Sequence, residues 1–133
     1  MIGLGRAKAD VAARSAARSA DTPRSELHAL ASHESVVVRR ALAANPAAPP
    51  SALDRLARDP DPQVRVAVAT NPNATAAALR RVVSAPAKGG FGGIARRKAL
   101  LAVADHPNAT PELLRALARD DDALVARRAA ARG

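Results

Sequence analysis

The apolar residues of this chain recur with a spacing much longer than the period of a helix or a strand. Leucines are separated by 26, 26 and 35 residues, at Leu27, Leu53, Leu79 and Leu114. A second apolar residue follows each of them three positions later, as Leu30, Leu56, Val82 and Leu117. A fixed period of this length is typical of stacked repeats, in which each unit buries its apolar face against its neighbours.

Each unit is predicted to contain two helices, of which the first begins at a polar cap. Asp61 followed by Pro62 is a favourable N-cap and first helical residue. Ser35 and Asp122 stand at the same position of other units, so the cap recurs. The helix carries an apolar stripe and ends before a proline, since proline disfavours helical geometry in the residue that precedes it. In one unit the stripe and the last residue are Val64, Ala67, Val68 and Asn71.

The second helix of each unit is predicted to begin at a threonine. Thr75 has this position in one unit, and Thr110, followed by Pro111 and Glu112, has it in a later one. The first helices are short and rich in alanine and β-branched residues, so we expect them to be partly 3₁₀-helical. Together these features predict an all-α solenoid of helical repeats.

Residues 38–46 and 64–72 share the pattern Val-Arg-x-Ala-x-Ala-x-Asn-Pro, and Leu-x-x-Leu-Ala-x-Asp follows at 53–59. This pattern resembles the leucine-rich repeat variant (LRV) family of HEAT-like helical repeats, over about residues 11–132. The resemblance implies a right-handed superhelix of alternating α and 3₁₀ helices, and it brings no general enzymatic activity. The cysteine-rich cluster module of some members is absent. The third unit departs from the pattern, with Ala99-Leu100 in place of Val-Arg and His106 in place of Asn.

The period organises residues 1–133 as a single helical-repeat domain. We expect an N-terminal capping repeat at 1–34, regular repeats at 35–60 and 61–86, a Gly-rich basic insertion at 87–98, a third repeat at 99–121 and a C-terminal capping helix at 122–133. The first twenty residues also have the Arg, Ala and Ser composition of an organellar transit peptide. We favour a helix over about 12–20, because Ala17 continues the alanine position of later units. The end in mid-repeat leaves a homodimer through the C-terminal repeat open.

Composition excludes several classes of site. The chain has no Cys, Trp or Tyr and a single Phe. Disulfides, iron–sulfur clusters and thiolate metal sites are therefore excluded, and we expect a cytoplasmic location. No apolar run is long enough to cross a membrane. Neither a cofactor nor a metal is expected, because His28, His33 and His106 lack ligand spacing and no serine has a recognisable base. We therefore expect a protein without catalytic activity.

Positive charge is concentrated in the middle of the chain. The formal net charge is +9, and no acidic residue stands between Asp61 and Asp105, where the basic residues are Arg65, Arg80, Arg81, Lys88, Arg96, Arg97 and Lys98. The third leucine interval exceeds the period of 26 by nine residues, within the Gly-rich stretch 84–98. Insertions in repeat proteins fall in loops, often on a binding face. The candidate binding residues are Lys88, Phe91, Arg96, Arg97 and Lys98, supported by Arg80 and Arg81.

Three interpretations of this basic segment remain open. It could bind an acidic protein partner, with Phe91 as a central anchor and arginines at the rim. It could bind the phosphates of a nucleic acid without sequence preference, through the basic surface of residues 65–98. It could also have no binding role, with Phe91 filling a gap in the stack. We favour the protein partner, because one aromatic residue is too few for base stacking. The glycine run lacks the Gly-Lys-Ser/Thr ending of a nucleotide-binding loop.

Three charged residues are expected to have a structural role. Asp59 precedes Arg65 by six residues, and Arg39 has the place of Arg65 in the preceding unit. This spacing resembles the ladder of Asp and Arg side chains that links successive HEAT repeats. We therefore expect Arg39, Arg65 and Asp59 to connect neighbouring units and not to bind a ligand.

Overall fold

The described part of the chain consists of helices joined by short turns and contains no strand. The structure is a computed structural model, which describes residues 2–85 and 92–132, with side chains described over 10–85 and 93–132. Its helices are α1 (Ile2–Arg18), α2 (Arg24–Leu30), α3 (Val36–Ala43), α4 (Pro50–Leu56), α5 (Pro62–Thr70), α6 (Ala76–Ser84), α7 (Gly92–Asp105), α8 (Pro111–Leu117) and α9 (Ala123–Arg132).

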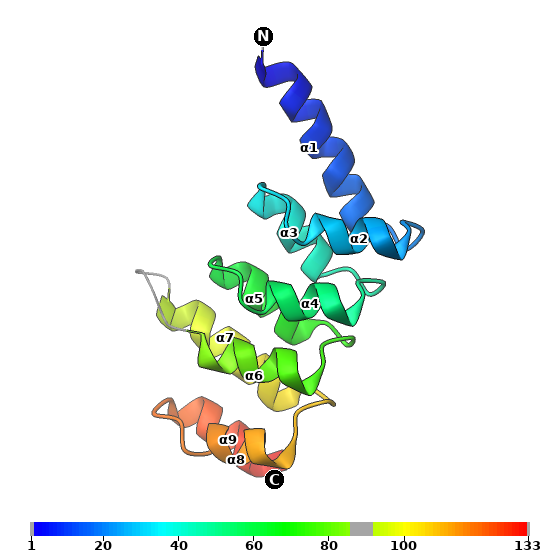
Figure 1. Cartoon of the computed structure of the whole chain (residues 1–133). Coiled ribbons are helices and arrows are strands. Elements are labelled where there is room, and N and C mark those ends of the chain that lie inside the picture. Colours follow the sequence, from blue (N-terminus) through cyan, green and yellow to red (C-terminus); the bar gives the residue numbers. More distant parts are fainter. Residues whose placement is uncertain (1, 86–91, 133) are drawn as a thin grey trace.

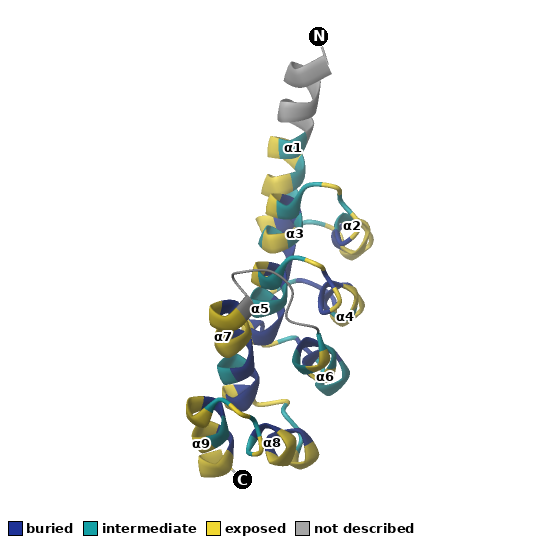
Figure 2. Ribbon diagram, turned by 90° about the vertical axis from the view of Figure 1, so that its left-hand side faces the viewer, coloured by how far each residue is buried: buried dark blue, intermediate teal, exposed yellow. Residues whose placement is uncertain are grey.

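The helices are arranged in two parallel rows. The odd-numbered helices form one row, in which each contacts the next, and the even-numbered helices form the other (Figure 2). Each helix also packs against its neighbour in the sequence, so α1 lies at one end of the stack and α9 at the other (Figure 1). The predicted all-α solenoid of helical repeats is confirmed.

Small side chains allow the odd-numbered helices to lie close together. One alanine of each unit is fully buried at the equivalent position, as Ala17, Ala43, Ala69 and Ala104. The periodic leucines of the even-numbered helices are buried in the same core and are at most 7% exposed. The core is thus a thin layer of Ala, Val and Leu that continues from unit to unit. Each unit contributes too little apolar surface to fold without its neighbours.

A buried asparagine connects each odd-numbered helix to the preceding one. The Asn71 Nδ2 group donates hydrogen bonds to the carbonyl oxygens of Ala43 (2.8 Å) and Asn45 (2.9 Å) at the end of α3. Asn45 donates in the same way to Ala17 (2.7 Å) and Ser19 (3.0 Å) at the end of α1. The last carbonyls of a helix have no partner within it, so these bonds satisfy groups that would otherwise be buried without one.

His106 and Arg132 have the same position in the later units. His106 Nε2 donates to the Asn71 carbonyl at 2.7 Å, and its Nδ1 accepts from the Asn108 backbone N–H at 3.0 Å. Because the first partner can only accept and the second can only donate, the imidazole is neutral and carries its proton on Nε2. Arg132 Nη1 donates to the carbonyls of Ala104 and His106, both at 2.7 Å.

Most of the predicted helix boundaries agree with the structure. The Asp61 carboxylate accepts from the N–H groups of Gln63 (2.7 Å) and Val64 (3.3 Å) at the start of α5. Thr75 and Thr110 cap α6 and α8, each by accepting one backbone N–H at 3.2 Å. Ser35 is the N-cap residue of α3, but its side chain makes no capping hydrogen bond.

Other expectations about local structure were wrong. The first helices of the units are α-helical over the described residues and none is 3₁₀-helical. Bonds between residues three apart occur instead after the helices, as from the Asp59 N–H to the Leu56 carbonyl (3.0 Å). The N-terminal helix, expected over about 12–20, extends from Ile2 to Arg18.

The loop predicted over residues 84–98 is helical at both of its ends, since Ser84 is the last residue of α6 and α7 begins at Gly92. We expected residues 84–98 to form a loop, but Gly92–Lys98 form the first two turns of α7. The sequence from Ile94 onward contains only residues that are compatible with a helix. Arg96 and Arg97 also form ion pairs with Asp120 and Asp122, which lie in the turn between α8 and α9. Lys88 and Phe91 lie outside the described residues.

We predict that His106 acts as a structural equivalent of asparagine. His106→Ala should lower the free energy of unfolding by about 1–3 kcal/mol, because the Asn71 carbonyl and the Asn108 N–H lose a buried partner. His106→Asn should stay within about 1 kcal/mol of the original protein, because Asn71 makes the equivalent bonds two helices earlier. Urea denaturation followed by circular dichroism measures both values. Equal destabilisation by the two substitutions would contradict this role.

Candidate functional site

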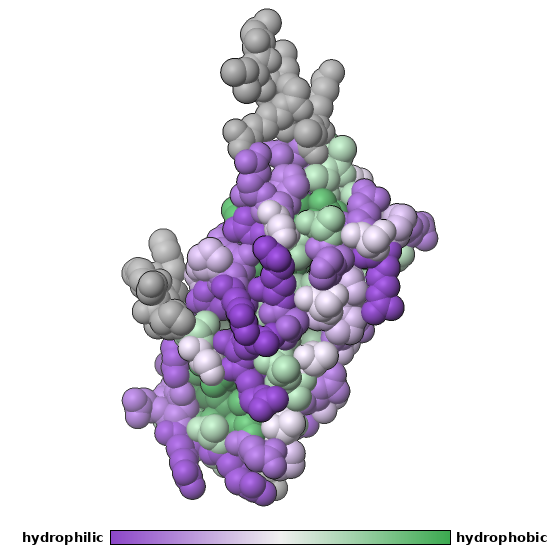
Figure 3. Space-filling model, viewed as in Figure 1, coloured by the Kyte–Doolittle hydropathy of each residue, from purple (hydrophilic) through white to green (hydrophobic). Residues whose placement is uncertain are grey.

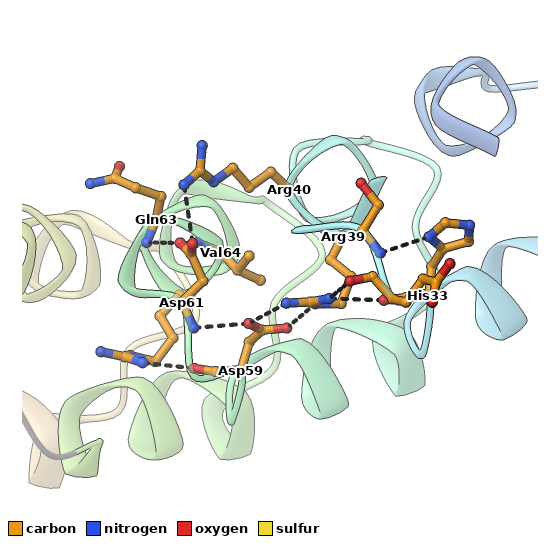
Figure 4. A network of polar contacts seen from close by, with 10 residues as sticks. His33, Arg39, Arg40, Asp59, Asp61, Gln63 and Val64 are labelled. Carbon is orange, nitrogen blue, oxygen red and sulfur yellow. Dashed lines mark hydrogen bonds and ion pairs between the residues drawn. The ribbon is translucent and has the colours of Figure 1, made fainter. Parts of the chain in front are cut away.

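A ladder of arginine–aspartate contacts follows the turns between the two rows of helices. Arg39 of α3 binds the Asp59 carboxylate through Nε (2.7 Å) and Nη2 (3.4 Å), and its Nη1 donates to the His33 carbonyl at 2.8 Å (Figure 4). The guanidinium therefore ties the turn after α2 to the turn after α4. The Asp59 side chain is 5% exposed and also accepts the Asp61 N–H at 2.9 Å. We call a contact of this kind, between an arginine and a carboxylate that has the place of Asp59 in its unit, a rung.

Asp61 combines its cap with a second ion pair. Arg40, next to Arg39, places Nη2 at 3.1 Å from Asp61 Oδ2 (Figure 4). Burial opposes ionisation of this carboxyl, but the Arg40 hydrogen bond and the N–H groups of Gln63 and Val64 outweigh it and hold the pKa of Asp61 below its usual value. An Arg-Arg pair on α3 thus binds an Asp-x-Asp segment before α5.

The same arrangement recurs between α7 and the turn before α9. Arg96 Nη2 lies 2.6 Å from Asp120 Oδ2, and Arg97 Nε lies 2.6 Å from Asp122 Oδ2. Hydrogen bonds from Arg96 and from Arg97 hold the pKa of Asp120 and of Asp122 below their usual values. The hydrogen bond to Asp120 in turn raises the pKa of Arg96.

The structure separates the predicted basic residues into two groups. Arg80 and Arg81 belong to α6 in the even-numbered row, whereas Arg96, Arg97 and Lys98 belong to α7 in the odd-numbered row. Arg81 pairs with Asp54 of α4, and Arg96 and Arg97 pair with Asp120 and Asp122. Only Arg80 and Lys98 are exposed and without an ion pair among the described residues of this set. Lys88 and Phe91 cannot be placed against them, so the joint patch stays a prediction.

The ladder residues predicted from the sequence take different partners. Asp59 binds Arg39 through its carboxylate, whereas Arg65 reaches only the Asp59 backbone carbonyl, from Nη1 at 2.7 Å. Arg65 has no ion pair in the described part of the chain.

Two adjoining hollows lie along these turns, beside α4 and α6. The larger has a volume of about 760 Å³ and the smaller about 380 Å³, and both are lined by Arg58, Asp59, Pro60 and Arg81. Arg55 lines the larger hollow and Arg65 the smaller. Hydrophilic side chains gather over the middle of the face shown in Figure 3, where α4 and α6 lie. We call this surface the arginine groove and define it by Arg55, Arg58, Arg65 and Arg81.

Charge in the arginine groove is not balanced. Five arginines line the two hollows, namely Arg39, Arg55, Arg58, Arg65 and Arg81, against three carboxylates, those of Glu34, Asp54 and Asp59. The Asp59 carboxylate is bound to Arg39, and Asp54 is bound to Arg81. Arg55, Arg58 and Arg65 make no ion pair with any described residue. The groove can therefore bind an anion through several guanidinium groups, which form paired hydrogen bonds with carboxylates and phosphates.

The prediction of a basic segment over residues 65–98 missed sequence signals for this groove. Asp120 and Asp122 follow Asp59 and Asp61 by 61 residues, the sum of one 26-residue and one 35-residue interval. Their positions therefore predict a second copy of the Asp-x-Asp turn. Arg58 directly precedes Asp59, so its place beside the ladder could also have been expected.

Two kinds of feature are absent from the described residues. No group of three or more His, Cys, Asp or Glu side chains there is placed to hold a metal ion. No helix there combines the length and the apolar character needed to cross a bilayer.

Comparison with known proteins identifies one repeat. A family model described as leucine rich repeat variant (LRV) matches residues 36–61, which comprise α3, α4 and the turn that contains Asp59. The family predicted from the sequence is thus shown for this segment. Searches of curated proteins and of solved structures gave no significant match.

We predict that the ladder makes the free energy of unfolding depend on pH in the acidic range. The pKa of Asp120 is lowered in the folded state, so its contribution is present above roughly pH 4, the value of a free aspartate, and is lost as the pH falls further. Asp120→Asn should cost about 1 kcal/mol at pH 7. The difference from the original protein should shrink toward pH 2.5, as measured by thermal unfolding at a series of pH values. Asp121→Asn is the control, because Asp121 forms no ion pair among the described residues and attracts Arg96 less than Asp120 does. A difference that stays constant with pH would refute the electrostatic account.

Proposed function

We propose that this chain is a non-catalytic repeat scaffold that binds an acidic protein partner in the arginine groove. The observation that carries the proposal is the set of Arg55, Arg58 and Arg65, which line the groove without an ion pair in the described structure. Groups of one charge along a hollow attract partners of the opposite charge and exclude others. Arg80 lines a further hollow with Arg81 and Ser84 and so adds positive charge beside the groove.

A protein partner fits this surface better than a nucleic acid does. Phosphate binding depends on a series of cations that release counterions along the backbone. Arg81, Arg96 and Arg97 belonged to the predicted basic surface of residues 65–98, but aspartates of this chain already neutralise them. A short groove with a few free guanidinium groups suits a short acidic segment.

The histidines support a role without catalysis. His33 and His106 each use Nδ1 to accept a backbone N–H, so they are not free to take a proton from a substrate. His28 Nδ1 lies 3.1 Å from Ser51 Oγ, but this pair is exposed, and no described carboxylate contacts its imidazole. A nucleophilic serine requires a base that is oriented by a third group.

The C-terminal repeat is a second candidate contact surface. Leu124 of α9 is 45% exposed at the end of the stack. A homodimer through this end stays a prediction, and size-exclusion chromatography with light scattering measures it directly.

We predict that an acidic peptide binds the groove and that the free arginines account for the affinity. A fluorescent Asp- and Glu-rich peptide should bind at about 150 mM salt, and Arg55→Ala with Arg58→Ala should weaken binding about fivefold. The matched control is Arg115→Ala with Arg119→Ala. Those two exposed arginines are on α8 and in the turn after it, outside the groove. Fluorescence anisotropy gives the dissociation constants.

The same assay distinguishes the alternatives. Duplex DNA, single-stranded DNA and RNA are measured beside the peptide from roughly 50 to 300 mM salt. If a nucleic acid binds near physiological salt and Arg55→Ala with Arg58→Ala abolishes this binding, nucleic-acid binding would replace the proposed function. A peptide that does not bind above about 100 mM salt, or that binds both double variants equally, would reject the acidic partner.

A further inference from the structure

One position of the ladder lacks the side chain that its neighbours have. Four residues follow the even-numbered helices at equivalent places, separated by 26, 26 and 35 residues, and they are His33, Asp59, Ala85 and Asp120. The backbone N–H of each donates to the carbonyl three residues earlier, at 3.0, 3.0, 3.3 and 3.0 Å in that order. Ala85 therefore makes the same backbone hydrogen bond as Asp59 and Asp120, although α6 continues two residues further in the period, to Ser84, than α4 and α8 do. The side chain differs, because Ala85 has no carboxylate.

Where the carboxylate is present, an arginine binds it. Asp59 forms the rung with Arg39, and Asp120 forms the rung with Arg96. Arg65 stands 26 residues after Arg39, so position 85 is where its aspartate would be expected. The chain cannot supply that carboxylate from nearby, because no Asp or Glu occurs from residue 62 to residue 104.

Arg65 is held as Arg39 is held. Its Nη1 donates to the Asp59 carbonyl at 2.7 Å, as Arg39 Nη1 donates to the His33 carbonyl at 2.8 Å. The Asp59 carbonyl is the single protein acceptor of Arg65 in the described structure. Arg39 uses Nε and Nη2 for its aspartate, and these groups of Arg65 have no described partner. A half-buried guanidinium that is already fixed by one hydrogen bond loses little conformational freedom when it binds an anion.

The surroundings of Arg65 form a site of suitable size. Arg65 and Ala85 line the same hollow of about 380 Å³, together with Arg58, Arg81 and Ser84. This volume can hold the side chain and neighbouring backbone of one residue. The aspartate that also lines it, Asp59, is bound to Arg39 and leaves the charge of Arg65 unneutralised.

We propose that Arg65 and Ala85 form an open rung, in which the carboxylate of an Asp or Glu side chain of the partner protein takes the place of the missing aspartate. The inference rests on the proposed function and specifies its anchor. Arg65 Nε and Nη2 bind the two carboxylate oxygens, while Arg58, which also has no described ion pair, adds positive charge at the rim. A carboxylate is the expected ligand because each complete rung holds one through two guanidinium nitrogens, Nε and Nη2 in Arg39 and Nη1 and Nη2 in Arg96.

The first test supplies the missing carboxylate from the chain itself. Ala85→Asp places a carboxylate opposite Arg65 and should raise the thermal unfolding midpoint by about 2–4 °C, whereas Ala85→Asn should not.

The second test uses a peptide probe. The probe is the acetylated and amidated peptide of residues 57–63, Ala-Arg-Asp-Pro-Asp-Pro-Gln, with a control peptide in which both Asp are replaced by Asn. Each is titrated to roughly 10 mM while the arginine Nε–H signals are followed by NMR, because a single contact is expected to be of millimolar affinity.

The open rung predicts a specific pattern of responses. The Arg65 Nε–H signal should shift saturably with the acidic peptide and not with the Asn peptide, and the Arg39 signal should not move. Ala85→Asp should weaken the response at least tenfold and Ala85→Asn should preserve it. No shift of Arg65, or an equal shift in Ala85→Asp, would overturn the inference. Tighter binding of inorganic phosphate in the same titration would overturn the assignment to a carboxylate.

Failure of the open rung and failure of the proposed function give different results. If the long acidic peptide binds the original protein and Ala85→Asp equally, while Arg55→Ala with Arg58→Ala weakens it, the groove function stands and the open rung is wrong. If Arg65 responds to the short peptide but the long acidic peptide does not bind, the open rung stands as a carboxylate site and the proposed scaffold function fails.

Discussion

The stack depends on side chains that satisfy the carbonyl groups at the ends of the odd-numbered helices. Asn45, Asn71, His106 and Arg132 each donate to carbonyls of the preceding odd-numbered helix. Because the helices are short, their unpaired ends are a large share of the backbone, and burying them without partners would oppose stacking. The geometry requires a side chain that can place a hydrogen-bond donor beside these carbonyls. Asparagine, histidine and arginine side chains all do so in this chain. The buried alanines then bring the helices close enough for these bonds to form.

Polar contacts on the other side of each unit have a different role. The Arg39 and Arg96 rungs join the turns between the two rows, and the Arg39–Asp59 pair is more buried than the Arg96–Asp120 pair. The unit that contains Arg65 and Ala85 has no rung and keeps its place in the stack, so a rung can be absent without loss of the fold. The carbonyl-binding residues are needed in every unit, whereas the rungs are optional. That division leaves the groove side of the stack available for binding.

The sequence predicted the architecture well and the charged surface only in part. The 26-residue period, the caps at Asp61, Thr75 and Thr110, and the asparagine–proline helix ends are local or periodic signals, and each of these caps is present in the structure. The ion pairs of Arg96 and Arg97 were not predicted. In the complete early unit the arginine and aspartate of a rung are 20 residues apart, but in the later one they are 24 apart. Leu100 has the place of Arg39 in the period, and Arg96 stands four residues, about one helical turn, before it. The glycines before Arg96 suggested a loop, whereas Asp120 and Asp122 of the next unit bind Arg96 and Arg97 in a helix.

At Ala85 the backbone contributes to the fold, while the side chain decides what the surface presents to other molecules. The backbone bond of this residue is made by any amino acid except proline, so its side chain is not constrained by the stack. A single codon therefore decides whether the neighbouring arginine is satisfied internally or left for another protein. In such an array, new recognition can evolve one position at a time with little pressure on the core, and paralogous repeats can diverge in specificity while they keep the same shape.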